Sequence, residues 1–92
     1  KRTSDLIPLC HPLPLDAIDV KIAADGRGAL RVEATVVTTW RTGVEMEALT
    51  AAPVAGLALI DMLKAVERGM AVTDLRVDFK SGGRSGEWRR SR

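Results

Sequence analysis

The sequence is poor in the residues on which several classes of small protein depend. Its one cysteine, Cys10, excludes a disulfide framework and an all-cysteine metal site, and we expect a reducing compartment. It has no tyrosine, and its three aromatic residues are too few for a surface that stacks nucleic-acid bases: Phe79, Trp40 and Trp88. We find no signal peptide and no apolar run that we expect to span a bilayer. We therefore expect a cytoplasmic protein that binds neither nucleic acid nor membrane.

The length of 92 residues fits a single domain, residues 1–92, with little area for a hydrophobic core. A chain of this size often needs partners to bury its apolar surface, and 46% of these residues are hydrophobic. The first residue is Lys1 and not methionine, so we interpret the chain as a piece of a longer protein, incomplete at its N-terminus. Residues 80–92 contain five cations and one anion. Such a basic end either attracts an anion or is simply solvated.

Alternating apolar and polar residues predict a β-hairpin in the first half of the chain. Residues 18–22 and 30–36 alternate, and the sequence DGRG (25–28) between them supplies the glycines of a turn. Residues 1–9 have the pattern of the last turns of a helix that ends near its proline. The sequence CHPLPL (10–15) has two prolines in three residues and predicts an extended connector.

A long apolar segment, residues 44–68, predicts a helix that ends before Gly69. Pro53 leaves its start open. Either the helix runs from Val44 through Pro53 and loses a hydrogen bond there, or Thr50 caps a helix in which Pro53 lies in the first turn. Because the segment is apolar most of the way round, we expect the helix to be buried.

The alternation at residues 75–79 predicts a third strand, followed by a Gly/Ser-rich loop that carries cations. The order helix–strand–strand–helix–strand is that of an α+β ferredoxin-like sandwich, an antiparallel sheet packed on helices, that lacks its first strand. That strand is central in the sheet. We therefore expect a gap, or a strand that comes from residues outside this sequence or from another subunit.

Four charged residues on the long helix are candidates for function. Glu45 and Glu47 either favour the positive end of the helix dipole or mark a substrate site at that end. Asp61 and Lys64 are either a surface ion pair at i,i+3 or a buried pair with a function, since a buried charge must be paired or used. The sequence pattern leaves both questions open.

His11 is the only histidine, and it lies on the proline-fixed connector. A histidine titrates near neutral pH, so it can bind a phosphate or relay a proton. The sequence KSGGRSG offers Lys80, Arg84 and backbone amides, the ingredients of a phosphate-binding nest, or it is a flexible solvated loop. It is not a P-loop, because no helix pattern follows it. One histidine and scattered carboxylates are a poor set of metal ligands, so we expect no metal and no cofactor.

Four motifs resemble, in order and spacing, those of cyclic pyranopterin monophosphate synthases, the molybdenum cofactor biosynthesis protein C family. They are KRTSDLIPLCHPLPL, TGVEMEALT, DMLKAVERGM and KSGGRSG. The resemblance implies a lyase that converts (8S)-3′,8-cyclo-7,8-dihydroguanosine 5′-triphosphate to cyclic pyranopterin monophosphate with release of diphosphate. It also implies a ferredoxin-like fold and a homohexamer, a trimer of dimers with sites shared between subunits.

The resemblance implies specific site residues. It places Asp61, Lys64 and Lys80 at catalytic positions, and the substrate site at Leu9, Cys10, His11, Met46 and Glu47. To the substrate-binding set we add Glu45 and Arg84. Our hypothesis is that Asp61 and Lys64 act as an acid–base pair, that Lys80, Arg84 and His11 hold the triphosphate, and that Glu47 accepts hydrogen bonds from the guanidine-like edge.

Two departures from the family pattern matter. The family carries an upstream His-His-Lys-Gly-Asp-like stretch with a lysine important for catalysis, which would precede Lys1. Pro53 stands where the family more often has a small residue. The alternative function is a non-catalytic ferredoxin-like module that binds a nucleotide or assembles with a partner.

Overall fold

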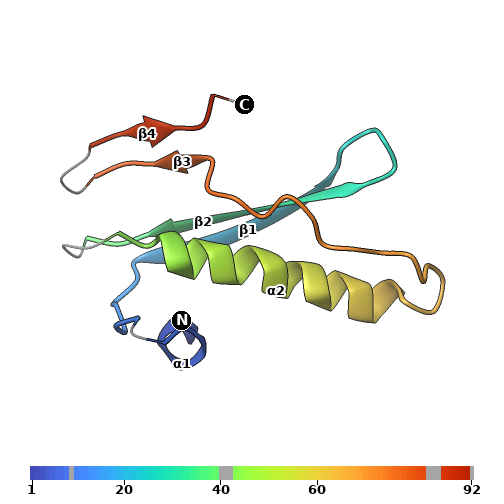
Figure 1. Cartoon of the computed structure of the whole chain (residues 1–92), viewed down its shortest axis with the longest axis horizontal. Helices are drawn as coiled ribbons and strands as arrows, with labels where there is room; N and C mark the ends of the chain where they lie inside the picture. Colours follow the sequence, from blue (N-terminus) through green and yellow to red (C-terminus); the bar gives the residue numbers. More distant parts are fainter. Residues whose placement is uncertain (9, 40–42, 83–85, 92) are drawn as a thin grey trace.

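The protein is a small α+β structure with antiparallel strands, as predicted. The computed structural model describes residues 1–8, 10–39, 43–82 and 86–91. Its elements, in chain order, are α1 (Thr3–Leu6), β1 (Ala17–Ala24), β2 (Leu30–Val37), α2 (Glu45–Leu63), β3 (Phe79–Lys80) and β4 (Trp88–Arg89). The strands β1 and β2 form one two-stranded sheet, and β3 and β4 form another (Figure 1). The helix α2 lies along the β1–β2 hairpin and contacts mainly β2 (Figure 1).

The β1–β2 hairpin confirms the strand and turn predictions. Its register runs from Ala17 opposite Val37 to Ala24 opposite Leu30. In the turn, Asp25 Oδ1 accepts hydrogen bonds from two backbone amides, at 2.7 and 3.1 Å. The two glycines of the turn have φ of 79° and 89°, a region that only glycine enters without strain. The hairpin thus provides the rigid edge against which the connector and α2 are placed.

The position at which α2 starts decides between the two helix starts that Pro53 left open. The helix begins at Glu45 and continues without a break through Pro53 to Leu63, so the alternative start at Thr50 is wrong. Its predicted end before Gly69 is also wrong by several residues. The amides of residues 66 and 67 both donate to the Leu63 carbonyl, at 3.0 Å each, and the chain turns away there.

The predicted third strand is much shorter than residues 75–79 suggested. Only Phe79 and Lys80 form a ladder, and their partner is β4, not the hairpin. Within the described ranges, residues 74–78 lie in no strand. They face β2 across a groove of about 1250 Å³, which we call the β2 groove. A strand is defined by its hydrogen-bonded neighbour, and residues 74–78 take part in neither of the two ladders.

The burial predicted for α2 is absent from the single chain. Among the described residues no hydrophobic side chain is buried, and Val54, Leu57 and Met62 of α2 are exposed. The expectation of a buried helix is therefore wrong for one copy of this chain, because α2 is contacted mainly by β2, with only small contributions from β1 and the short α1. The expectation that no segment resembles a membrane span is also wrong: by length and composition alone α2 qualifies, with a mean hydropathy of 1.5. A core helix of a soluble protein passes the same test, so this criterion does not separate the two.

Pro53 offers a direct test of the unbroken helix. Proline gives no N–H to the Leu49 carbonyl and crowds it, so we expect Pro53→Ala to raise the free energy of unfolding by about 1–2 kcal/mol. Urea denaturation of the intact protein measures the change. Arg68→Ala, at an exposed polar position beyond the end of α2, is the control and should shift stability by less than about 0.5 kcal/mol. A Pro53→Ala variant that is no more stable than the control would show that the helix does not lose this bond.

Candidate functional site

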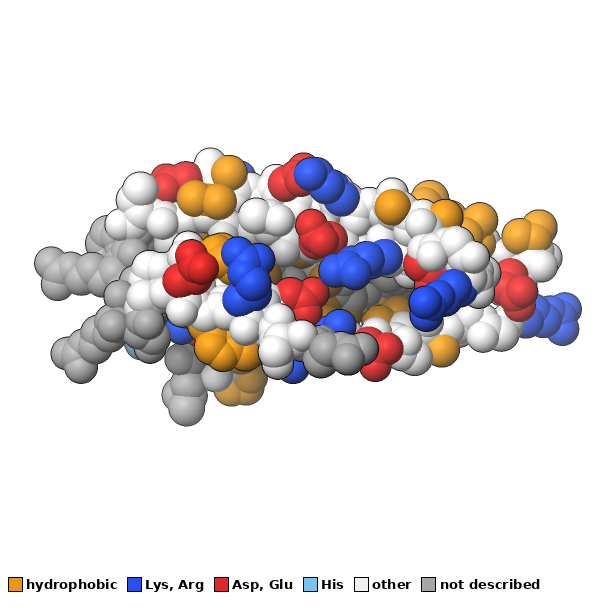
Figure 2. All heavy atoms as spheres, turned by 90° about the horizontal axis from the view of Figure 1, so that it is seen from above, with side chains coloured by type: hydrophobic (Ala, Val, Ile, Leu, Met, Phe, Trp, Pro, Cys, Tyr) orange, Lys and Arg blue, Asp and Glu red, His pale blue; other side chains and the backbone are white. Residues whose placement is uncertain are grey.

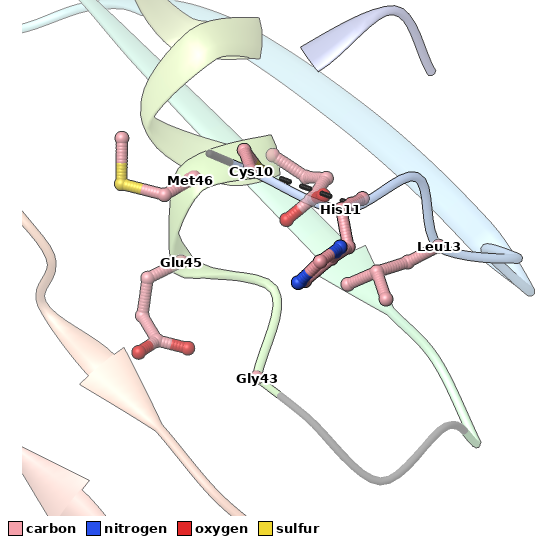
Figure 3. A pocket seen from close by; sticks show the side chains of 7 residues that line it. Cys10, His11, Leu13, Gly43, Glu45 and Met46 are labelled. Carbon is pink, nitrogen blue, oxygen red and sulfur yellow. Dashed lines mark hydrogen bonds between the residues drawn. The ribbon is translucent and has the colours of Figure 1, made fainter. Parts of the chain in front are cut away.

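A pocket of about 310 Å³ lies between the connector after α1 and the start of α2. Its lining residues are Cys10, His11, Leu13, Gly43, Glu45, Met46 and Glu47, and Figure 3 shows their side chains around it. We call it the Cys10–Glu47 pocket. The structure thus brings together five of the predicted substrate-site residues, from two segments that are far apart in the sequence.

Hydrogen bonds to the end of β2 hold the connector in place. The Thr38 hydroxyl donates to the Pro14 carbonyl at 2.7 Å, and the Asp16 amide donates to the Val37 carbonyl at 2.8 Å. The two prolines of the connector fix φ and restrict the residue before each of them. His11 is therefore held at the pocket wall by a segment that has few alternative conformations.

The first turn of α2 supplies the acidic side of the pocket. Glu45 and Glu47 lie in this turn, where the positive end of the helix dipole favours carboxylates. Glu47 is only 7% exposed, and among the described residues its carboxylate takes part in no hydrogen bond or ion pair. Among the described residues no fully enclosed side-chain oxygen lacks a partner, so the carboxylate oxygens of Glu47 reach the open space of the pocket. Capping therefore explains the placement of Glu45 and Glu47 in part, but it does not give Glu47 a partner.

Glu45 links the pocket to β3. The Lys80 ammonium donates to Glu45 Oε2 at 3.0 Å, and both side chains are about one-third exposed (34% and 35%). In Figure 3 the Glu45 side chain extends from α2 toward the neighbouring strand. The hydrogen bond from Lys80 lowers the pKa of Glu45, against a smaller opposing effect of partial burial. Lys80, predicted to be catalytic, thus lies against a residue that lines the pocket.

Asp61 and Lys64 lie away from the pocket and in solvent. Lys64 Nζ is 3.1 Å from Asp61 Oδ1, with side chains 69% and 76% exposed, so within one chain this is a surface ion pair. Fourteen residues separate Asp61 from Glu47, which at 1.5 Å per residue is about 21 Å along α2. The expectation that Asp61 and Lys64 are withdrawn from water is wrong for the single chain. Their predicted catalytic role stays a prediction.

Three of the arginines that line the β2 groove are paired with carboxylates. Asp78 is the common partner: it is 3.4 Å from Arg31, 3.1 Å from Arg76 and 3.6 Å from Arg90. The face drawn in Figure 2 accordingly shows acidic and basic side chains side by side. The contact from Arg31 to Asp78 crosses the groove, because Arg31 belongs to β2 and Asp78 to the segment opposite. These arginines are therefore partly neutralised by Asp78.

Two lining residues, Leu13 and Gly43, are absent from the sequence-based prediction. Gly43 lies within the TGVEMEALT motif, and Leu13 lies between the connector prolines. The only signal in the sequence that pointed to them was their position next to predicted site residues. The predicted residues Leu9 and Arg84 lie outside the described residues. In the part of the chain that the structure describes, no three His, Cys, Asp or Glu side chains are grouped as metal ligands.

Comparison with known sequences identifies the family. The sequence pattern of the MoaC family matches residues 1–83. The chain belongs to the MoaC family. Its fold, a small α+β structure with antiparallel strands, is compatible with this membership.

Several curated MoaC relatives are more than half identical to the chain. It is similar to "Cyclic pyranopterin monophosphate synthase 3" of Mycobacterium tuberculosis (strain ATCC 25618 / H37Rv), with 58% identity over 98% of this chain and 51% of the relative. It is 57% identical to "Cyclic pyranopterin monophosphate synthase" of Streptomyces coelicolor, over 99% of this chain and 53% of the relative. The protein of that name from Thermomicrobium roseum is 56% identical, over 98% and 55%. The chain thus spans about half the length of the curated relatives it matches.

The Glu45–Lys80 pair predicts a pH effect. Because the folded-state pKa of Glu45 is lowered, the pair stabilises the fold above the ordinary pKa of a glutamate, and this contribution is lost as the pH falls through the lowered value. We expect Lys80→Met to raise the pKa of Glu45, as read from an NMR titration of its carboxyl carbon. Lys21→Met, on the exposed strand β1, is the control and should leave the titration unchanged. An identical Glu45 titration in the wild type and in Lys80→Met would contradict the pair.

Proposed function

We propose that the protein of which this chain is part is a lyase of molybdenum cofactor biosynthesis. It converts (8S)-3′,8-cyclo-7,8-dihydroguanosine 5′-triphosphate to cyclic pyranopterin monophosphate and releases diphosphate, without a metal or other cofactor. The observation that carries the proposal is the pocket lined by Glu47, whose carboxylate has no partner among the described residues, beside His11 and Cys10, in a chain of the MoaC family. The printed names of the relatives support the same reaction.

Glu47 is the group that recognises the base. A carboxylate offers two oxygens to the paired N–H donors of a guanidine-like edge, and such charge-assisted bonds are short and strong. The binding of this edge would give Glu47 the partner that it lacks. Met46 and Leu13 add apolar contact area for the ring system, and Cys10 adds a small side chain to the wall.

The phosphates are held at the pocket edge by cations. Lys80 lies against Glu45 there, and His11 lines the wall. Together with Arg84 these residues would neutralise the triphosphate and stabilise the diphosphate as it leaves. The arginines around Asp78 are less suited to this role, because they line the β2 groove and not the Cys10–Glu47 pocket.

The acid–base chemistry requires a second copy of the chain. Asp61 and Lys64 are too far along α2 to reach a substrate at Glu47 of the same chain. We therefore propose that these residues of one copy complete the pocket of another, in a hexamer built as a trimer of dimers. The exposed apolar side chains of α2 support such an assembly, because a stable protein covers large apolar surfaces. Contact with a neighbour would also remove water from around the Asp61–Lys64 pair.

We propose a ferredoxin-like sandwich in which the missing first strand occupies the β2 groove, between β2 and residues 74–80. The groove supports this, because β2 lines one side of it and the predicted third strand lines the other. The protein would be cytoplasmic, with α2 in a protein interface and not in a membrane, and with no nucleic-acid partner.

A binding function without turnover is the second candidate. It is favoured by the position of Asp61 and Lys64, which are exposed and distant from the pocket in the single chain. Such a module would bind the cyclised triphosphate or a related nucleotide through the Cys10–Glu47 pocket. The intact protein, incubated with the cyclised triphosphate, separates the two: release of diphosphate with formation of the cyclic monophosphate supports the lyase, and tight binding without product supports the module.

Substitution of the acid–base pair tests the mechanism. We expect Asp61→Asn and Lys64→Ala each to lower kcat by at least about 100-fold, the size of a general acid–base contribution. Glu67→Gln, an acidic residue just beyond the end of α2, is the control and should retain nearly full turnover. Near-wild-type turnover of either Asp61→Asn or Lys64→Ala would rule out the pair as the acid and base.

Hydrogen exchange tests the strand in the β2 groove. In a two-stranded ladder only alternate amides of β2 are bonded, since the others point to its free edge. We expect all amides of Leu30–Val37 to be protected in the intact protein, because the added strand takes the outward-pointing ones. Alternate protection along β2, with every second amide exchanging as fast as a loop amide, would exclude a strand in the groove.

A further inference from the structure

Gly43 is required for the space beside it and not for its backbone conformation. Four other glycines, Gly26, Gly28, Gly82 and Gly86, have positive φ, and Gly43 is not among the positive-φ residues of the described chain. A Cβ atom added at Gly43 would overlap Glu45 Oε1 and lie 3.0 Å from Glu45 Cδ. The carboxylate of Glu45 therefore folds back over the Cα atom of Gly43, and any side chain there would push it away.

The conformation that Gly43 permits is the one that bonds Lys80. Glu45 Oε1 lies against Gly43, and Oε2 of the same carboxylate accepts from the Lys80 ammonium at 3.0 Å. Gly43 and Glu45 line both the Cys10–Glu47 pocket and the β2 groove, so their contact lies where the two cavities meet. In the described part of the chain this is the ion pair that Lys80 makes.

We infer that Gly43 and Glu45 are positioning residues that fix the Lys80 ammonium at the rim of the Cys10–Glu47 pocket. This differs from a direct role of Glu45 in binding the substrate. A lysine side chain has four rotatable bonds, and holding its ammonium in one place before the substrate arrives reduces the entropy lost on binding. Gly43 acts on Lys80 indirectly, through Glu45, because its lack of a side chain leaves the space that the Glu45 carboxylate occupies when it bonds Lys80. The expected effect on substrate binding rests on the proposed function, whereas the contacts of Glu45 with Gly43 and Lys80 do not.

The first test needs no substrate. We expect Gly43→Ala to displace the Glu45 carboxylate from Lys80 and so to raise the pKa of Glu45, as Lys80→Met does. Gly69→Ala is a matched control: Gly69 also lacks a positive φ, and a Cβ there would meet the end of a glutamate side chain, Glu67 Oε1, at 3.3 Å. NMR titration of the Glu45 carboxyl in the intact protein gives the result. An unchanged Glu45 titration in Gly43→Ala overturns the inference whatever the activity of the protein.

The second test uses a double-mutant cycle on binding of the cyclised triphosphate. If Gly43 and Glu45 act through Lys80, then Gly43→Ala and Glu45→Gln should each weaken binding about tenfold, the size of one charge-assisted hydrogen bond. In a Lys80→Ala background the same substitutions should weaken it by less than about twofold. Equal losses in both backgrounds overturn the inference, because the residues would then act independently of Lys80.

The two tests separate the inference from the proposed function. If the protein neither binds nor converts the cyclised triphosphate, the proposed function fails, and the titration still decides whether Gly43 and Glu45 hold Lys80. The Glu45→Gln variant guards against misfolding of Gly43→Ala, because it keeps the size of the side chain and removes only its charge. A Glu45→Gln loss that persists in the absence of Lys80 would assign Glu45 to the substrate instead.

Discussion

The uncovered apolar surface of this chain is the constraint on which the other features depend. Hydrophobic burial is the main favourable term in folding, and a chain of 92 residues has little of it to spare. Here one face of α2 remains open, although the composition of this helix is that of a protein core, and the strand β1 is exposed along its whole length. The favourable state of such a surface is one covered by protein. Any explanation of the site must therefore include what covers α2 and fills the β2 groove.

Local interactions fix the pocket even though the apolar surface is open. The connector is tied to β2 by two hydrogen bonds, and its prolines restrict the rest, so His11 stays near the start of α2. The first turn of α2 then sets Glu47 into the wall and Glu45 against Lys80. None of these contacts needs a complete core. The binding half of the site is thus formed within one chain by short-range contacts and one hairpin.

Sequence patterns predicted the parts of the structure that depend on near neighbours. The period-two alternation and the DGRG turn gave the hairpin, and the prolines gave the connector. The motif resemblance gave four pocket residues, and Glu45 was added to them separately; periodicity alone does not bring these residues together. The third strand and the burial of α2 were mispredicted because both depend on which elements lie beside these segments, and the periodicity of a segment does not specify its neighbours. Gly43 was missed because its role is a space beside Glu45, which no local pattern encodes.

The separation of the two ends of α2 suggests how assembly and chemistry are linked. In one chain the pocket lies at the N-terminal end of the helix, and Asp61 lies about 21 Å from Glu47 along α2, paired with Lys64 and exposed to water. An exposed ion pair is screened and makes a weak acid–base couple, whereas a pair out of water interacts strongly and has a tunable pKa. In the proposed hexamer, one intersubunit contact along α2 would cover the apolar face of the helix and exclude water from the Asp61–Lys64 pair. The same contact would place this pair at the Cys10–Glu47 pocket of a neighbouring chain. Substrate binding and reactivity would then come from different chains, and the reaction would proceed only in the assembled protein.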